Sequence, residues 1–573
     1  MESESEPGFQ QIVFCIIFVL FSCTTTLLTA QTFSRPQIKK PTLSGDIRAE
    51  MQYDGIRGRQ QGRPKWIRTL EVTPTISLPN LPTFNLLINI STLESYLRQP
   101  FNRFNLQIQP PWGGFYLGDS YPVFSKYSLN GILVRGGSVD INPGLFRLAI
   151  AVGQTKRAIK RYGDFPLPNY GQRLYGLKIG VGKKTGTRLN INFVKAGDQL
   201  SSLQEPGARK PVENIILGAD GFLRLYQGKL TFSGEFAASA YNRDLRSPEI
   251  SVPDYVPSYA TRLFTPTISS QYDLACFLES RLALGQNSFR FKFENIGAGF
   301  YSLGTPYLHN DIRRFGLSST HRLLRNKVVL SLGMDRGRDN LSKLKSATTS
   351  TTSGYTNSTV LLSRRTSFTV GYRFYSQRNN DVNERWRVNN LMQSVILAAS
   401  RQFRIRSFRP SLRLNYFKNW YRNKTPFARP NSDYDTETIR LSGTLRMKSA
   451  FSVYASLGYM RNRLKRIAKK DTRWLYNLGI SHTALKKRLT SHLRLNYDEG
   501  KASNYLRYTD RDSLEYNVRK RWSLSFRSDY RLNNQTISFK LERIIYHDRN
   551  YPLYNYREFV VRFIFTRHFS VLK

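Results

Sequence analysis

Residues 557–569 constrain the fold more than any other stretch, because their side chains alternate between two kinds. One parity is apolar and consists of Phe559, Val561, Phe563, Phe565 and Phe569, whereas the other is largely polar. A period of two puts each parity on its own face of a β-strand. An aromatic-rich last strand of this kind is what a membrane β-barrel needs to close its final seam. We predict that all five belong to a terminal assembly strand, that the first four face lipid and that Arg562 faces the lumen.

The rest of the chain repeats this alternation, hairpin after hairpin, at intervals of roughly 20 residues. No helical pattern longer than about ten residues interrupts it, which argues against a βαβ architecture. Strands in the second half are predicted over 367–375, 390–400, 410–416, 437–447, 451–459, 475–483, 488–497, 522–532 and 536–545. The pattern predicts an all-β protein with little helix, folded as a single large antiparallel transmembrane β-barrel of about 20–26 strands.

A soluble β-sandwich would show the same alternation with its apolar face turned inward. The aromatic content, 33 Tyr and 36 Phe, and the terminal strand favour the membrane barrel. Outside the N-terminus the chain has no apolar run of about 20 residues, which a membrane helix requires.

The N-terminal segment has the features of a secretory signal. An apolar run over 12–20 fades towards Ala30, a plausible last residue before cleavage. The acidic residues Glu2, Glu4 and Glu6 depart from the usual basic start of a signal peptide. We predict a signal peptide over 1–30, a polar lead-in over 31–44 and an outer-membrane barrel over 45–573. A lipoprotein signal acylated at Cys23 and a retained anchor helix are the alternatives.

The chain is strongly basic, with 87 Lys and Arg against 40 Asp and Glu and a formal charge of +47. Such a charge attracts anions, among them lipopolysaccharide phosphates and acidic polymers. No nucleic-acid-binding motif accompanies it, so no nucleic-acid partner is expected. After cleavage Cys276 would be the single cysteine, and the six His have no ligand spacing, so no metal or cofactor is predicted.

Basic side chains on the polar parity of predicted strands are the candidate functional residues. They are Arg290, Lys292, Arg413, Arg440, Arg446, Arg494, Arg527, Lys540 and Arg562. If these faces point inward, the lumen is positive and favours anions. Contact with lipopolysaccharide phosphates at the membrane rims and charge pairing within the wall are the alternatives.

Several segments are expected to depart from regular strands. Residues 346–359 and 421–436 read as polar loops, and 246–266 as a long loop within one barrel. The glycine-rich stretch 118–137 is interpreted as strand bends in the barrel wall, with a functional constriction as the alternative. Long loops alternating with tight turns are typical of outer-membrane barrels.

Five phrases resemble, as a set, a family of uncharacterised outer-membrane β-barrel proteins of Gram-negative bacteria. They are STLESYLRQPFNRF (91–104), LGDSYPVFSKYSLNGILVRG (117–136), GQTKRAI (153–159), PVENIILGAD (211–220) and FYSLGTPYLHND (300–311). The second phrase is also loosely similar to strands of secretion translocons and fimbrial ushers. The resemblance implies an integral outer-membrane location, with lipid, lipopolysaccharide and the barrel-assembly machinery as partners, and it implies no catalytic residue.

The sequence therefore predicts a channel or translocon with a basic lumen that passes or holds an anionic or extended polymer, or a secreted protein. A structural or adhesive barrel whose extracellular loops bind a partner is the alternative. An enzyme is not expected, because no catalytic motif is present; a barrel hydrolase using Ser481 and His482 is the remaining enzymatic candidate.

Overall fold

The computed structural model describes residues 41–571, except 60–61, 63, 80, 95–101, 160–167, 204–208, 252–262, 407, 426, 428–431, 448–449, 467–468 and 504–515. The predicted signal peptide over 1–30, its two alternatives, and residues 31–40 of the lead-in lie outside the described residues, and residues 42–44 of the lead-in are part of β1.

Within the described residues the chain forms one sheet of 26 strands. The first half comprises β1 (Thr42–Arg57), β2 (Trp66–Ser77), β3 (Thr83–Ser91), β4 (Arg103–Gln109), β5 (Gly113–Ser120), β6 (Val134–Ile141), β7 (Phe146–Lys156), β8 (Gln172–Gly182), β9 (Arg188–Asp198), β10 (Glu213–Leu225), β11 (Leu230–Asn242), β12 (Ser270–Leu284) and β13 (Asn287–Ile296).

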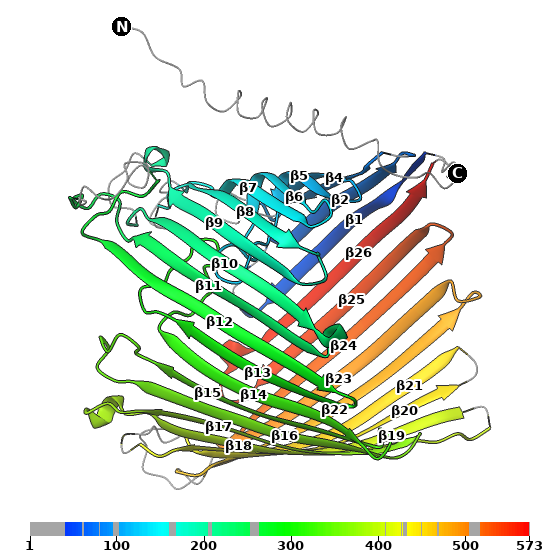
Figure 1. Ribbon diagram of the computed structural model, residues 1–573. Helices are drawn as coiled ribbons and strands as arrows, with labels where there is room; N and C mark the ends of the chain where they lie inside the picture. Colours follow the sequence, from blue (N-terminus) through cyan, green and yellow to red (C-terminus); the bar gives the residue numbers. More distant parts are fainter. Residues whose placement is uncertain are drawn as a thin grey trace.

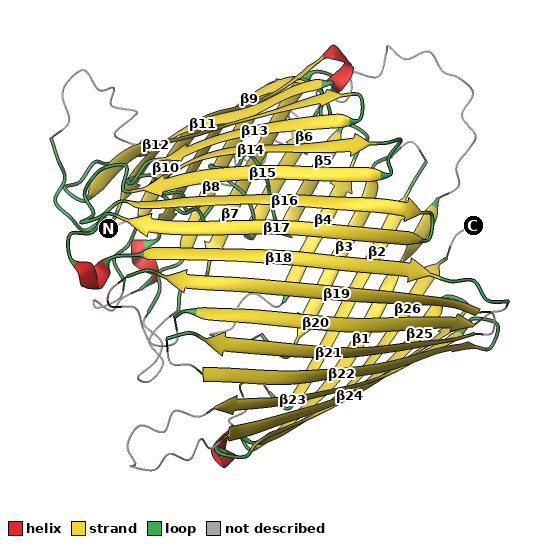
Figure 2. Cartoon of the chain, turned by 90° about the horizontal axis from the view of Figure 1, so that it is seen from below, coloured by secondary structure: helices red, strands yellow, loops and turns green. Residues whose placement is uncertain are grey.

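The second half comprises β14 (Ile312–Leu323), β15 (Val328–Asp339), β16 (Thr349–Ser363), β17 (Thr366–Asn379), β18 (Asn389–Gln402), β19 (Phe408–Asn423), β20 (Tyr434–Met447), β21 (Phe451–Leu464), β22 (Lys469–Ala484), β23 (Leu489–Ser503), β24 (Tyr516–Leu532), β25 (Gln535–Asp548) and β26 (Tyr556–Ser570). Four short 3-10 turns, η1 (Leu200–Ser202), η2 (Tyr226–Gly228), η3 (Glu384–Trp386) and η4 (Pro552–Tyr554), lie in the connections (Figure 2). No helix in the described part of the chain is long and apolar enough to cross a membrane.

The sheet closes on itself because the first strand pairs with the last. β1 and β26 are antiparallel from Ser44 opposite Ser570 to Arg57 opposite Arg557. The blue β1 and the red β26 lie side by side in the tilted wall (Figure 1). Closure leaves no unpaired strand edge, which a structure in hydrocarbon requires. The predicted all-β closed barrel is confirmed, and its strand number is at the upper end of the expected range.

Connections at the two ends of the barrel differ in length. At the end that holds both sheet termini no connection exceeds five residues, and the turn between Leu284 and Asn287 has two. At the other end the connections include 157–171, 199–212 and 243–269. Outer-membrane barrels have short periplasmic turns and longer extracellular loops, so the short-turn end corresponds to the periplasmic side.

One of the loop predictions from the sequence is wrong. Residues 346–359 read as a Ser/Thr-rich loop, but Thr349–Ser363 forms β16, paired with β15 and β17 over its length. Thr is favoured in strands because its β-branched side chain suits a pleated surface. Its hydroxyl side chains lie on both faces of the wall, with Thr351 and Ser353 on the polar face and Thr356, opposite Leu332, on the other. The predicted loop over 421–436 shortens to the connection between Asn423 and Tyr434.

The two faces of the wall can be followed around the ring, since residues directly opposite in an antiparallel pair share a face. Glu235 lies opposite Phe277, which lies opposite Glu294, which lies opposite Arg314. At the seam, Lys540 lies opposite Arg562, which lies opposite Gln52. This face carries charged side chains on strand after strand. We call it the polar face.

The other face is an exposed apolar surface. Its large exposed side chains include Ile179, Ile191, Leu217, Phe236, Leu278, Phe291, Leu317, Leu441, Leu478 and Phe563. A charged side chain facing lipid at mid-membrane costs about 2–4 kcal/mol, so only this apolar face suits hydrocarbon. The barrel is therefore an integral membrane protein with its polar face turned inward.

Candidate functional site: an inner layer packed on the polar face

The connection between β5 and β6 packs against the inside of the barrel wall. Residues 121–133, between β5 and β6, pack against the polar face of β7 to β13; we call them the inner segment. Tyr127 and Leu129 in this segment are both 0% exposed. The principal hydrophobic cluster of the molecule joins them to the wall and contains Phe124, Tyr127, Leu129, Val134, Ala149, Ala151, Leu174, Val194, Ala196, Ile216, Ala237, Ala275, Ile296 and Phe300. A barrel whose core lies on the lumen side has part of its interior filled.

Small residues on the wall make room for the inner segment. A Cβ built on Gly176 would lie 2.7 Å from the ring of Phe124. Ala151, Ala237 and Ala275 are fully buried on the neighbouring strands. Larger side chains there would meet the packed segment, because protein interiors have few voids to absorb them.

Glu235 on β11 holds the backbone of the inner segment. Its carboxylate accepts hydrogen bonds from the hydroxyl of Ser125 at 2.7 Å and from the backbone N–H groups of Lys126 at 2.8 Å and Tyr127 at 2.9 Å. The ammonium group of Lys178 on β8 donates to the carbonyl oxygen of Phe124. These charged groups satisfy backbone groups that strand pairing cannot reach, since the segment lies away from the ladder.

Glu294 on β13 is the second acidic anchor. It accepts hydrogen bonds from the hydroxyl of Tyr127 at 3.2 Å and from the ammonium group of Lys126. The ring of Tyr127 packs edge-on against Phe277 and Phe300, with centroids 5.8 and 5.9 Å away. Burial, together with the negative charge of Glu294, raises the pKa of Tyr127 well above its ordinary value. The phenol therefore stays protonated and remains a donor to Glu294.

Residues 297–311, between β13 and β14, form a second inner segment against the first. The N–H of Asn130 donates to the carbonyl oxygen of Gly304 at 3.0 Å, and the hydroxyl of Ser302 donates to the carbonyl oxygen of Ser128 at 3.2 Å. A Cβ on Gly304 would lie 2.1 Å from the oxygen of Ser128, so the two backbones approach too closely for any side chain there. The two segments together are called the inner layer.

The inner layer corrects the interpretation of the stretch 118–137. Gly118, with φ +99°, and Gly136 do lie in the wall, where backbone carbonyls fill the space a Cβ would need. Residues 121–133, however, leave the wall and narrow the interior. The many glycines in this stretch indicated that backbones approach closely there. The local pattern could not identify the residues that hold the inner segment, because Glu235 and Glu294 lie more than 100 residues away in sequence.

All nine basic candidates lie on the polar face by register. Four of them contact carboxylates: Arg290 contacts Glu279 at 2.6 Å, Arg527 contacts Asp529 at 2.9 Å, Lys540 contacts Glu542 at 2.8 Å and Arg562 contacts Glu50 at 3.3 Å. Arg562 also donates a hydrogen bond to the side-chain oxygen of Gln52 at 2.9 Å. Arg440 donates to the hydroxyl of Ser456 at 3.0 Å. Lys292, Arg413, Arg446 and Arg494 are exposed on this face. The structure does not gather the nine into one site; they are spread around the ring.

Three of them share a pocket at the seam. Arg527, Lys540 and Arg562 line a cavity of about 340 Å³ together with Arg48. Arg48 contacts Glu50 at 2.9 Å, and the other three contact the carboxylates named above. This seam pocket is therefore a network of paired charges, as one of the alternatives from the sequence anticipated.

The predicted assembly strand is β26. Phe559, Val561, Phe563, Phe565 and Phe569 share the apolar face, and the ring of Phe563 lies 4.9 Å from that of Phe539 on β25. Phe565 lies opposite Ala49, and Phe569 opposite Gly45, on β1. Their role in membrane assembly remains a prediction.

The hydrolase candidates are not brought together. Ser481 and His482 are neighbours in β22, so their side chains point to opposite faces of the wall. Ser481 bonds Ser452, and His482 stacks on Phe451 at 4.1 Å. Among the described residues no group of His, Cys, Asp and Glu could hold a metal ion.

A closed antiparallel barrel with an apolar outside, a polar inside and one short-turn end is the architecture of an integral outer-membrane β-barrel protein. No protein-family model matches the sequence, and no curated protein is detectably similar to it.

Solved structures of the same broad architecture share little sequence with this chain. A BenF-like porin from Pseudomonas fluorescens Pf-5 superposes with a TM-score of 0.32 at 11% identity, covering 67% of this chain and 97% of the porin. OpdK from Pseudomonas aeruginosa, determined with vanillate, gives 0.30 at 10% identity, covering 63% and 93%. OccAB2 from Acinetobacter baumannii gives 0.30 at 13% identity, covering 66% and 97%. The outer-membrane class of this protein follows from the closed strand register and its two faces described above.

Proposed function

We propose that this protein is an outer-membrane channel for anions, narrowed by its own inner layer. The register supports the proposal, because the nine basic candidates share the parity of the wall residues that contact the inner segment. Barrels that enclose a water-filled channel are selective according to the charges lining it. A basic lining favours anions.

The inner layer limits what can pass. Its hydrogen bonds and buried rings anchor it to β8, β11 and β13, so the lumen is smaller than the bare ring of 26 strands would allow. Small anions or an extended anionic polymer fit this geometry better than a folded secreted protein. Similarity to secretion translocons and ushers stays a prediction from the sequence.

Conductance in a planar bilayer tests the proposal. Under a salt gradient, the reversal potential of the reconstituted barrel is expected to show anion selectivity. The triple variant Arg413→Gln, Arg440→Gln, Arg494→Gln removes three charges from the polar face and is expected to reduce that selectivity. Arg401→Gln is a single-charge control on the other face: Arg401 lies opposite Leu412 on the apolar face, with its guanidinium 5.0 Å from the ring of Phe403. A barrel that does not conduct, or that prefers cations, contradicts the proposal.

The second candidate function, a surface barrel that binds a partner through its loops, has one observation in its favour. The long connections gather at the end opposite the termini, and the longest, 243–269, joins β11 to β12. Of the two polar loops predicted from the sequence over 346–359 and 421–436, however, the first is mostly strand. A phenotype retained after the connections 243–269 and 424–433 are exchanged for short turns would remove this candidate.

A further inference from the structure

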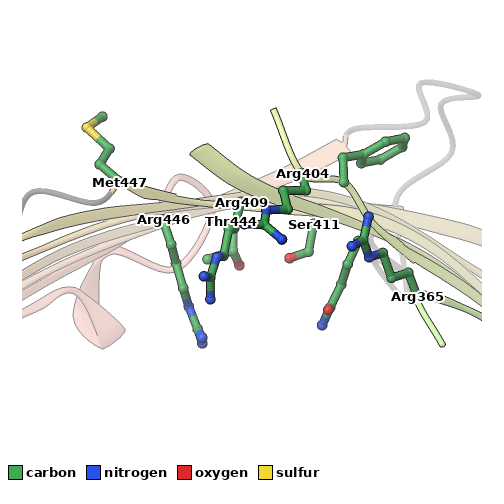
Figure 3. Close-up of a pocket in the computed structure, with 9 residues that line it drawn as sticks. Arg365, Arg404, Arg409, Ser411, Thr444, Arg446 and Met447 are labelled. Atoms are coloured by element: carbon green, nitrogen blue, oxygen red, sulfur yellow. The ribbon is translucent and has the colours of Figure 1, made fainter. Parts of the chain in front are cut away.

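Four arginines converge at the short-turn end of the barrel. Arg365 comes from the turn between β16 and β17, Arg404 from the turn between β18 and β19, Arg409 from the start of β19, and Arg446 from the end of β20 (Figure 3). They line a pocket of about 660 Å³, which we call the four-arginine pocket. Arg446 is one of the nine basic candidates selected from the sequence.

Strand register and turn hydrogen bonds bring these residues together. Arg409 lies directly opposite Arg446 in the β19–β20 pair. The N–H of Gln402 donates to the carbonyl oxygen of Arg365 at 2.8 Å, which ties the two turns side by side. Like charges directly opposite each other in a sheet are destabilising. The pair is therefore an arrangement that folding alone disfavours and that a bound anion would stabilise.

Among the described residues, the lining of the pocket contains no acid. Besides the arginines it includes Gln402, Ser411 and Thr444, which lie on the same face as Arg409 and Arg446 and offer neutral donors. Within the described residues none of the four guanidinium groups forms an ion pair. The seam pocket, in contrast, holds four basic residues that all contact carboxylates. Each pocket is thus lined by four basic side chains, but only those of the seam pocket are paired with carboxylates within the described residues.

The direction of the side chains places the site on the water side. Arg446 and Ser411 extend to one side of the strands, and Met447 extends to the other (Figure 3). Because Met447 is on the apolar parity, the arginines face the interior at its periplasmic mouth. A ligand would arrive from the aqueous interior or the periplasm rather than from lipid.

Guanidinium groups recognise oxyanions through paired N–H donors, and several around one space suit a multiply charged anion better than a single carboxylate. We propose that the four-arginine pocket binds a free anion carrying two phosphate-type groups, each held by two of the arginines. This deepens the proposed anion channel and rests on it: the pocket would be the place where such an anion is held at the periplasmic mouth.

Equilibrium binding to the full-length folded barrel tests the site without measuring current. In calorimetry with pyrophosphate, the wild-type protein is expected to bind saturably, more tightly than it binds acetate, and with strong salt dependence. Arg409→Gln with Arg446→Gln is expected to weaken pyrophosphate binding at least tenfold.

The seam pocket supplies the matched control. Arg527→Gln with Lys540→Gln removes the same number of charges from the same face and is expected to leave binding within about twofold of wild type. Heat-dependent gel mobility verifies that both double variants fold. No saturable binding by the folded wild type, binding that requires anionic lipid, or equal weakening by both pairs overturns the proposal. Because conductance is measured separately, a barrel that binds pyrophosphate without conducting would leave this site standing and remove the channel.

Discussion

Glu235 on β11 accepts a 2.9 Å hydrogen bond from the backbone N–H of Tyr127, a residue 108 positions earlier in the chain. The same carboxylate also accepts from Ser125 and Lys126. One buried wall residue thus holds three consecutive residues of the inner segment.

Replacing this anchor should loosen the inner segment while the barrel stays closed. Hydrogen bonds to charged groups contribute about 1.5–3 kcal/mol each, so Glu235→Ala, which removes three, should free the segment. We expect larger and noisier single-channel conductance. Glu279→Ala is the matched control, because Glu279 lies on the same face but contacts Arg281 and Arg290 on the wall instead of the segment. Unchanged conductance in the Glu235 variant would show that the segment is held without it.

Two substitutions of Tyr127 separate the contribution of its ring packing from that of its hydrogen bond. Its ring is fully buried between Phe277 and Phe300, so Tyr127→Ala should cost about 3–5 kcal/mol of local stability through the cavity it leaves. Tyr127→Phe keeps the ring and removes the 3.2 Å hydrogen bond to Glu294. Hydrogen exchange of residues 121–133 should rise strongly in the alanine variant and only slightly in the phenylalanine variant. Equal exchange in the two would mean that the ring contributes little.

The sequence allowed the wall to be predicted, because its determinants are local. The alternation in 288–294 and 557–569 is a property of neighbouring residues, and an antiparallel ring repeats it in each hairpin. The inner layer depends on contacts such as Glu235 with Tyr127, which no short-range pattern encodes. Tyr127, Glu235 and Glu294 were therefore not selected as candidates.

The same distinction explains the four-arginine pocket. The alternation within each strand could not show that Arg409 and Arg446 lie opposite each other, because that depends on the register fixed by the turns. Nor could it show that Arg527 and Lys540 have acidic neighbours whereas Arg446 has a second arginine. The charges that face each other across neighbouring strands therefore locate this pocket, whereas the number of charges along the chain does not.

A contact between two connections outside the membrane-spanning strands should be sensitive to acid. Burial opposes ionisation of Asp311, but Lys345, 2.5 Å away, and the N–H of Leu341 outweigh it and hold the pKa of Asp311 below its ordinary value. The same hydrogen bond raises the pKa of Lys345. The contribution of Asp311 is therefore present above its unfolded pKa of about 3.9 and is lost as the pH falls through its lower folded pKa. The contribution of Lys345 to stability is lost only at high pH, as the pH rises through its raised pKa, which lies above the ordinary value of about 10.4.

Hydrogen exchange of residues 340–345, corrected for the intrinsic effect of pH, measures this contact. Protection should be constant from about pH 5 to 9 and should fall only below about pH 3.9. Asp311→Asn should abolish this acid dependence and lower protection at neutral pH. Loss of protection already at pH 5–6 in the wild type would contradict the assigned direction of the Asp311 shift.

The last strand provides a test of closure. Phe565 lies opposite Ala49 on β1 and Ile537 on β25, and Phe569 lies opposite Gly45, where its ring atom would be 2.9 Å from a Cβ. A carboxylate at either position would face lipid, at a cost of up to a few kcal/mol that rises with depth, and would remove the aromatic contact across the seam. Phe565→Asp and Phe569→Asp should therefore block membrane assembly. Thr566→Asp is the matched control, because Thr566 lies on the polar face opposite Arg48, which can pair with the new charge. Assembly is measured by heat-modifiable mobility of the outer-membrane fraction. Normal assembly of both Phe variants would refute the role of these aromatics, and failure of Thr566→Asp as well would show that the strand tolerates no added charge on either face.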